Sequence, residues 1–140
     1  MRKLNVMPIP LMRRITSVAT VIALMAPLHA SSAQEKLGIL EIFDQFALAN
    51  AAASKCIKPD NNTLMHYLAN FQMITVYTSM ELQKQYPNHT KEQITEAMKR
   101  KTELLSQKVH DVIRDKGCSD PRIQDLIKRF HVQAEWQPGN

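Results

Sequence analysis

The sequence predicts an all-α fold, a small four-helix up-down bundle with one disulfide between Cys56 and Cys118, after an N-terminal signal peptide. Three observations support this prediction. Apolar residues recur at helical spacing in four segments. Short stretches rich in turn-forming residues separate those segments. The chain has two cysteines, which in an exported protein indicate one disulfide.

Residues 1–33 have the three parts of a secretory signal peptide. Four basic residues lie near the start, and an apolar run of eleven residues extends from Val18 to Leu28. This run is too short to cross a bilayer. Small residues, Ser31 and Ala33, stand three and one positions before the expected cleavage ahead of Gln34. We therefore expect export to the periplasm, or secretion.

The leader leaves two alternatives open. Translation could start at Met1, Met7 or Met12, since each would leave a basic segment before the apolar run. The paired Arg13 and Arg14 would also suit a twin-arginine signal, although the surrounding residues favour the general export route. In each case residues 34–140 remain as a single helical domain, and we expect no membrane span in this mature chain.

Removal of the leader changes the charge balance. The whole chain has a formal net charge of +5, but four of its 18 Lys and Arg residues lie in the leader, and all 13 Asp and Glu residues follow it. The mature chain therefore has a net charge of +1 and gives no indication of a nucleic-acid partner. With three glycines, the sequence has no phosphate-binding or dinucleotide motif. We expect no catalytic residues, no cofactor and no metal site.

The four expected helices follow from apolar period and turn signals. The first spans residues 36–54, with an apolar face of Ile39, Leu40, Phe43, Phe46, Ala47 and Ala51. The second spans residues 63–85, with a core stripe of Leu64, Leu68, Phe71, Ile74, Thr75 and Leu82. Residues 72–78 are rich in β-branched side chains, so a strand is the alternative there.

The last two helices have clear end signals. Thr90 and Gln93 fit a capping box that begins the third helix, and Gly117 would end it in a left-handed cap. The fourth begins at Asp120 and Pro121, a capping residue and a residue suited to the first helical turn. Because short connections make successive helices antiparallel, Cys56 and Cys118 should meet at the same end of the bundle.

The second helix has a further stripe that predicts an interaction surface. No charged residue occurs between Asn61 and Met80, and His66, Met73, Tyr77 and Met80 line a side nearly opposite the core stripe. Methionine and tyrosine suit adaptable contacts. We therefore expect these four residues to bind another protein, or a second copy of the chain as a homodimer. The alternative is that the second helix is central and is covered by the other three.

Three functional hypotheses follow from the sequence. The first is an exported protein-interaction module: a stress chaperone, an inhibitor or immunity factor, or an envelope accessory factor. Its layout, helices with one disulfide, broadly resembles that of the small acid-stress chaperones of the periplasm, without a shared motif. The second is a carrier that holds a small apolar ligand between its helices. The third is a small hydrolase built on scattered residues such as His110, which no residue spacing supports.

Overall fold

The computed structural model describes residues 37–137, and the predicted signal peptide lies outside them. The described residues form four α-helices: α1 (Ile39–Cys56), α2 (Asn61–Gln85), α3 (Lys91–Lys116) and α4 (Pro121–Glu135). The helices and their order agree with the predicted all-α fold. The alternative of a strand at residues 72–78 is wrong, because α2 is continuous through them. Among the described helices, none is both long and apolar enough to cross a membrane.

The ends of α3 and α4 confirm the predicted caps. The Thr90 hydroxyl accepts a hydrogen bond from the Gln93 backbone N–H (3.2 Å), and the Gln93 side chain accepts one from the Thr90 N–H (2.8 Å). Asp120 caps α4 by accepting a hydrogen bond from the Arg122 N–H (3.0 Å). Gly117 ends α3 with φ 78° as predicted, but its ψ of 173° lies outside the left-handed helical region.

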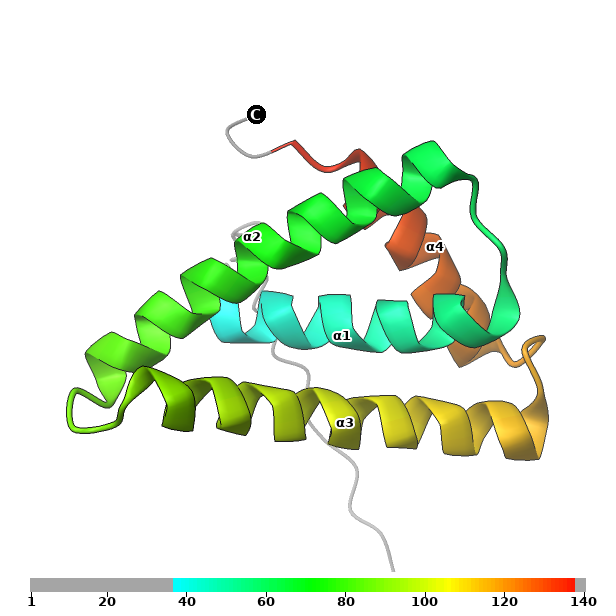
Figure 1. The fold of residues 1–140 in the computed structure, drawn as a ribbon. Coiled ribbons are helices and arrows are strands. Elements are labelled where there is room, and N and C mark those ends of the chain that lie inside the picture. Colours follow the sequence, from blue (N-terminus) through cyan, green and yellow to red (C-terminus); the bar gives the residue numbers. More distant parts are fainter. Residues whose placement is uncertain (1–36, 138–140) are drawn as a thin grey trace, which may run out of the picture. The chain divides into compact units, whose positions relative to one another are not determined.

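Successive helices run in opposite directions, and α1 lies between α2 and α3 (Figure 1). The buried residues of α1 surround its axis, and five of them are alanines, which allow close approach of neighbouring helices: Ala47, Ala49, Ala51, Ala52 and Ala53. The alternative in which the second helix is central is therefore wrong. The central helix is α1, whereas α2 is buried along one side.

The predicted disulfide is present. Cys56 is the last residue of α1 and Cys118 lies in the connection between α3 and α4, with the two Cα atoms 5.6 Å apart. The bridge joins residues 62 positions apart, at the end of the bundle where α1 ends and α4 begins. Beneath it, a small apolar cluster links α1, α3 and α4: Ala51, Ala52, Val109, Ile123 and Ile127.

The larger core cluster is aromatic and lies where α1, α2 and α4 meet. The rings of Tyr67 and Phe130 stack with centroids 4.1 Å apart, and Phe46 packs beside Tyr67 at 5.5 Å. Ile94 and Met98 extend this cluster onto α3. All four helices thus contribute to one apolar core. This core fixes the orientation of α2 and so determines which side of the helix is exposed.

The core side of α2 differs from the predicted stripe. Leu64 and Leu68 are 36% and 50% exposed, whereas Tyr67, Asn70 and Thr78 are buried beside the predicted Ile74. These polar groups find partners on other helices. The Tyr67 hydroxyl donates to the Phe46 carbonyl oxygen (2.5 Å), and the Thr78 hydroxyl donates to that of Ile39 (3.4 Å). Polar groups that keep their hydrogen bonds can be buried at low cost. The side of α2 that packs on the core is therefore the one with Tyr67, Asn70 and Thr78, and Leu64 and Leu68 face solvent.

Candidate functional site

The strongest candidate site is the side of α2 that faces away from the core. Eleven large apolar side chains of the described residues are exposed, and six of them lie on α2: Leu64, Met65, Leu68, Val76, Tyr77 and Met80. By contrast, α3 and α4 each contribute one, Leu104 and Val132. Single exposed apolar residues are ordinary, but a group on one helix indicates a contact surface.

Two of these six residues, Val76 and Met80, belong to a set with a regular spacing. We define the outer face of α2 by five residues at alternating intervals of three and four positions: His66, Ala69, Met73, Val76 and Met80. On an α-helix such positions form one continuous seam. Met80 is 54% exposed and Val76 51%, and Met73 is partly buried. The seam extends from His66 to Met80, about 21 Å of helix, within the uncharged stretch that begins at Asn61.

The structure places the four predicted surface residues as follows. His66, Tyr77 and Met80 are exposed, and Met73 is partly buried. His66, Met73 and Met80 belong to the outer face, whereas Tyr77 lies at its edge. The sequence reasoning missed Val76 and the flanking Met65, which is 69% exposed. The spacing of Met73, Val76 and Met80 was the signal that could have found Val76.

A groove runs beside the outer face, between α2 and α3. Its volume is about 410 Å³, and apolar side chains from three helices line it: Phe43 on α1, Phe71 on α2 and Met98 on α3. Polar residues of α3, Thr95, Lys99 and Thr102, line it together with Val76, which also belongs to the outer face. The groove and the outer face are therefore neighbouring parts of one exposed, largely apolar region.

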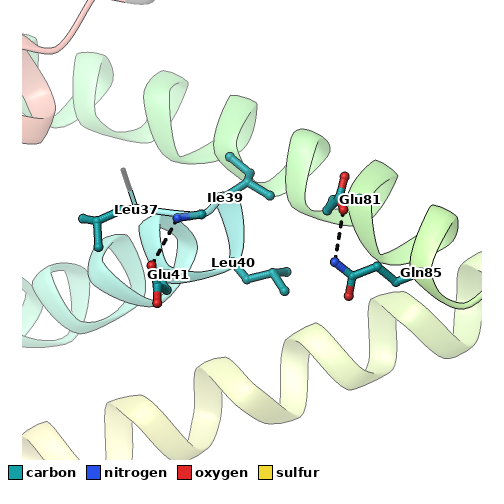
Figure 2. Close-up of a pocket in the computed structure, with 7 residues that line it drawn as sticks. Leu37, Ile39, Leu40, Glu41, Glu81 and Gln85 are labelled. Carbon is teal, nitrogen blue, oxygen red and sulfur yellow. Dashed lines mark hydrogen bonds between the residues drawn. The ribbon is translucent and has the colours of Figure 1, made fainter. Parts of the chain in front are cut away.

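A second hollow lies where α1 begins (Figure 2). Leu37 lines it from just before α1, Ile39 and Leu40 from the first turn of α1, and Glu81 and Gln85 from α2, around a volume of about 690 Å³. The Gln85 amide donates to the Glu81 carboxylate (3.0 Å), so these polar groups satisfy one another. The hollow lies where residues 37–40 lead into α1, and Glu41, which also lines it, accepts a hydrogen bond from the Gly38 N–H (3.1 Å).

Titratable side chains of the described residues gather at a further hollow of about 320 Å³, which Lys55, His110, Asp111 and Arg114 line. No three His, Cys, Asp or Glu residues between positions 37 and 137 lie close enough to hold a metal ion. Three buried polar atoms have no hydrogen-bond partner, but they belong to three different helices: Asp44 Oδ1, His110 Nε2 and Gln133 Oε1. The other carboxylate oxygen of Asp44 is paired with Lys101 Nζ at 2.8 Å.

The pKa shifts of Tyr67, Asp60 and Asp120 arise from core packing and helix capping. Burial raises the pKa of the Tyr67 phenol. The hydrogen bonds from the Thr63 side chain and N–H lower the pKa of the Asp60 carboxyl, which caps α2. The hydrogen bond from Arg122 and its positive charge lower the pKa of the Asp120 carboxyl, which caps α4. These groups stabilise the core and the helix ends, and none lies on the outer face of α2.

Comparison with known proteins gives no relative. No protein-family model, no curated protein and no solved structure matches the chain. The disulfide fits a protein that folds in an oxidising environment.

Proposed function

We propose that this chain is an exported helical interaction module that binds a protein partner through the outer face of α2. The observation that carries the proposal is the concentration of exposed apolar side chains on α2, which has no charge between Asn61 and Met80; two of them, Val76 and Met80, belong to the outer face and the others flank it. A face of this kind loses little on desolvation, because no charged group must leave water. Full burial of one Met or Val side chain contributes roughly 1.5–3 kcal/mol.

The rest of the molecule supports this role as a scaffold. α2 is held along its core side by the aromatic cluster and by hydrogen bonds to α1 and α4, so its outer face is presented on a rigid element. The proposed compartment is the periplasm, or the outside of the cell, after removal of residues 1–33. A disulfide that joins α1 to the α3–α4 connection suits a small domain in that environment.

Site-specific photocross-linking in the native host tests the proposal. A photoreactive residue replaces Val76 on the outer face, and the same residue replaces Leu104 on α3 as the matched control, since the two side chains are 51% and 65% exposed. The proposal expects a discrete cross-linked product from position 76 and none, or a much weaker one, from position 104. Equal products from both positions, or none from either, would contradict it.

The groove between α2 and α3 favours a second candidate function, the carriage of a small apolar ligand. The apolar lining by Phe43, Phe71 and Met98 is the observation behind it. Native mass spectrometry of the protein purified from its host would then show added mass. The variant Thr95→Trp, which fills the groove from α3, should remove that mass. Absence of added mass in the natural protein would reject this candidate.

A binding role is proposed here in place of a catalytic one. The outer face has one titratable side chain, His66, and no serine, cysteine or carboxylate beside it in the seam. A hydrolase would need a nucleophile and a base within hydrogen-bond reach of one another. A measured hydrolytic activity that disappears in His110→Ala would overturn this part of the proposal.

A further inference from the structure

We propose that the groove between α2 and α3 binds a fatty acid, with its carboxylate at Lys99 and its acyl chain along the apolar lining. This inference rests on the second candidate function and names the class of its ligand. It does not depend on a protein partner at the outer face of α2. Three properties of the groove support it: its charge, its hydrogen-bond donors and its apolar wall.

The groove has one charged lining residue. Of the nine residues that line it, Lys99 carries a charge, and the other eight are apolar or have a hydroxyl group. Glu96, one turn earlier on α3, is paired with Arg100 (3.8 Å), and within residues 37–137 no carboxylate forms an ion pair with Lys99. An ammonium group beside an apolar surface favours a ligand that is apolar apart from one anionic group.

Two hydroxyl groups add donors next to this charge. The hydroxyls of Thr75 and Thr102 donate to backbone carbonyl oxygens of their own helices, at 2.8 and 3.0 Å. Those of Ser79 and Thr95 form no hydrogen bond within residues 37–137. Thr95 lies four positions before Lys99, and a long helical side chain leans towards the turn before it, so Lys99 extends towards Thr95. These three groups can therefore donate to one carboxylate.

The apolar wall lies beside these donors. Phe43 and Met98 are 4% and 8% exposed at the inner side of the groove, and Phe71 is partly buried beside them. α2 and α3 are antiparallel and are joined by a short connection (Figure 1). Ser79 and Thr95 therefore lie nearer this connection than Phe71 does. The groove thus has donors towards one end and aromatic rings towards the other, as the two ends of a fatty acid require.

The size of the groove suits a single acyl chain. Its volume of about 410 Å³ lies in the lower part of the range of small-molecule sites, roughly 300–1,000 Å³. A medium-chain acid such as decanoate therefore suits it better than a phospholipid with two chains. The groove is open on one side, so part of the chain stays in water. We expect the dissociation constant to fall about twofold with each added methylene group.

Three other hollows suit an anionic ligand less well because carboxylates line them. Glu41 and Glu81 line the hollow at the start of α1. Asp111 lines the one beside His110, and Glu135 lines one at the end of α4. A fatty-acid carboxylate would be repelled by these groups. The groove beside Lys99 has no carboxylate in its lining, so it is the site to which we assign the ligand.

A charge reversal at position 99 tests the inference. Isothermal titration calorimetry of the disulfide-bonded protein compares decanoate with decylammonium, both below the concentrations at which they form micelles. The natural chain should bind decanoate at least ~5-fold more tightly. Lys99→Gln should remove this preference, and Lys99→Glu should reverse it. The matched control is Lys108→Glu, an exposed position of α3 outside the groove, which changes the net charge equally and should keep the preference.

Far-ultraviolet circular dichroism verifies that each variant is folded. Equal affinity of the natural chain for the two ligands would overturn the inference. So would a preference that changes alike in Lys99→Glu and Lys108→Glu, or in neither of them.

The neutral ligand decanol separates this inference from the second candidate function. If decanol binds and Thr95→Trp abolishes its binding, but the variants at position 99 keep the natural preference, the groove holds an apolar ligand and the fatty-acid assignment is wrong. If none of the three ligands binds, or if Thr95→Trp leaves their binding unchanged, both are overturned. The cross-link from position 76 tests the protein partner independently.

Discussion

The side chain of Asn70 in the middle of α2 donates a hydrogen bond from Nδ2 to the carbonyl oxygen of Trp136, at 2.8 Å, just beyond the end of α4. The same Nδ2 group donates to the carbonyl oxygen of Gln133, also at 2.8 Å. The last carbonyl groups of a helix have no partner within the helix. Asn70 therefore caps α4 from another helix, and it fixes which side of α2 faces inward.

The capping role of Asn70 predicts a stability loss on its removal. Asn70→Ala leaves buried carbonyl groups at the end of α4 without their donor, and it should reduce the free energy of unfolding by about 1–3 kcal/mol. Urea denaturation followed by circular dichroism measures the change. The control is Asn62→Ala, at an exposed position of α2, which should have little effect. Equal losses from the two variants would argue against the cap.

A second prediction concerns the hydroxyl of Tyr67, which donates to the Phe46 carbonyl oxygen. Tyr67→Phe keeps the stacked ring next to Phe130 but removes this hydrogen bond. The free energy of unfolding should fall by about 0.5–1.5 kcal/mol. Tyr77→Phe, at a side chain that is 50% exposed, is the matched control and should leave it unchanged. No difference between the two variants would contradict this assignment.

The same phenol predicts a pH dependence. Because burial raises the pKa of Tyr67, the unfolded chain loses this proton at a lower pH than the folded chain does. The contribution to stability is complete below the ordinary tyrosine pKa of about 10, and it declines as the pH rises above that value. Urea midpoints between about pH 8 and pH 11 should fall more steeply for the natural chain than for Tyr67→Phe. Parallel slopes would contradict the prediction.

The disulfide predicts a large response to reductant. Closure of a loop between residues 62 positions apart is worth about 4 kcal/mol in the chain-entropy model. Reduction should lower the urea midpoint of the natural chain to that of the double variant Cys56→Ala, Cys118→Ala. The double variant should itself be insensitive to reductant. A natural chain whose midpoint does not change on complete reduction would rule out this contribution.

Local signals in the sequence predicted the helices and the disulfide well. Thr90, Gln93 and Pro121 act through residues within one helical turn, so their roles can be read from neighbouring positions. The pairing of Cys56 with Cys118 followed from the presence of two cysteines in a chain expected to be exported, and the alternating helix direction agreed with it. Each of these inferences depends on contacts close in sequence or on a simple rule of topology.

The inward side of α2 could not be predicted in the same way. This helix has apolar residues around most of its circumference, so the apolar period alone does not select a side. The selection comes from Tyr67 and Asn70, whose partners lie 21 or more positions away in sequence. The exposure of Leu68, which the sequence assigned to the core, is the consequence. The outer face was predicted in part, since His66, Met73 and Met80 do belong to it.

Oxidation of methionine tests the account of the outer face most directly. Met80 and Met65 are 54% and 69% exposed, and Met98 is 8% exposed in the core. Dilute peroxide should oxidise Met80 rapidly in the purified protein and at least several-fold more slowly in the intact cell envelope, where a partner covers the seam. Met98 should react slowly in every sample. If Met80 reacts at the same rate in all of them, the outer face of α2 is not an interaction surface.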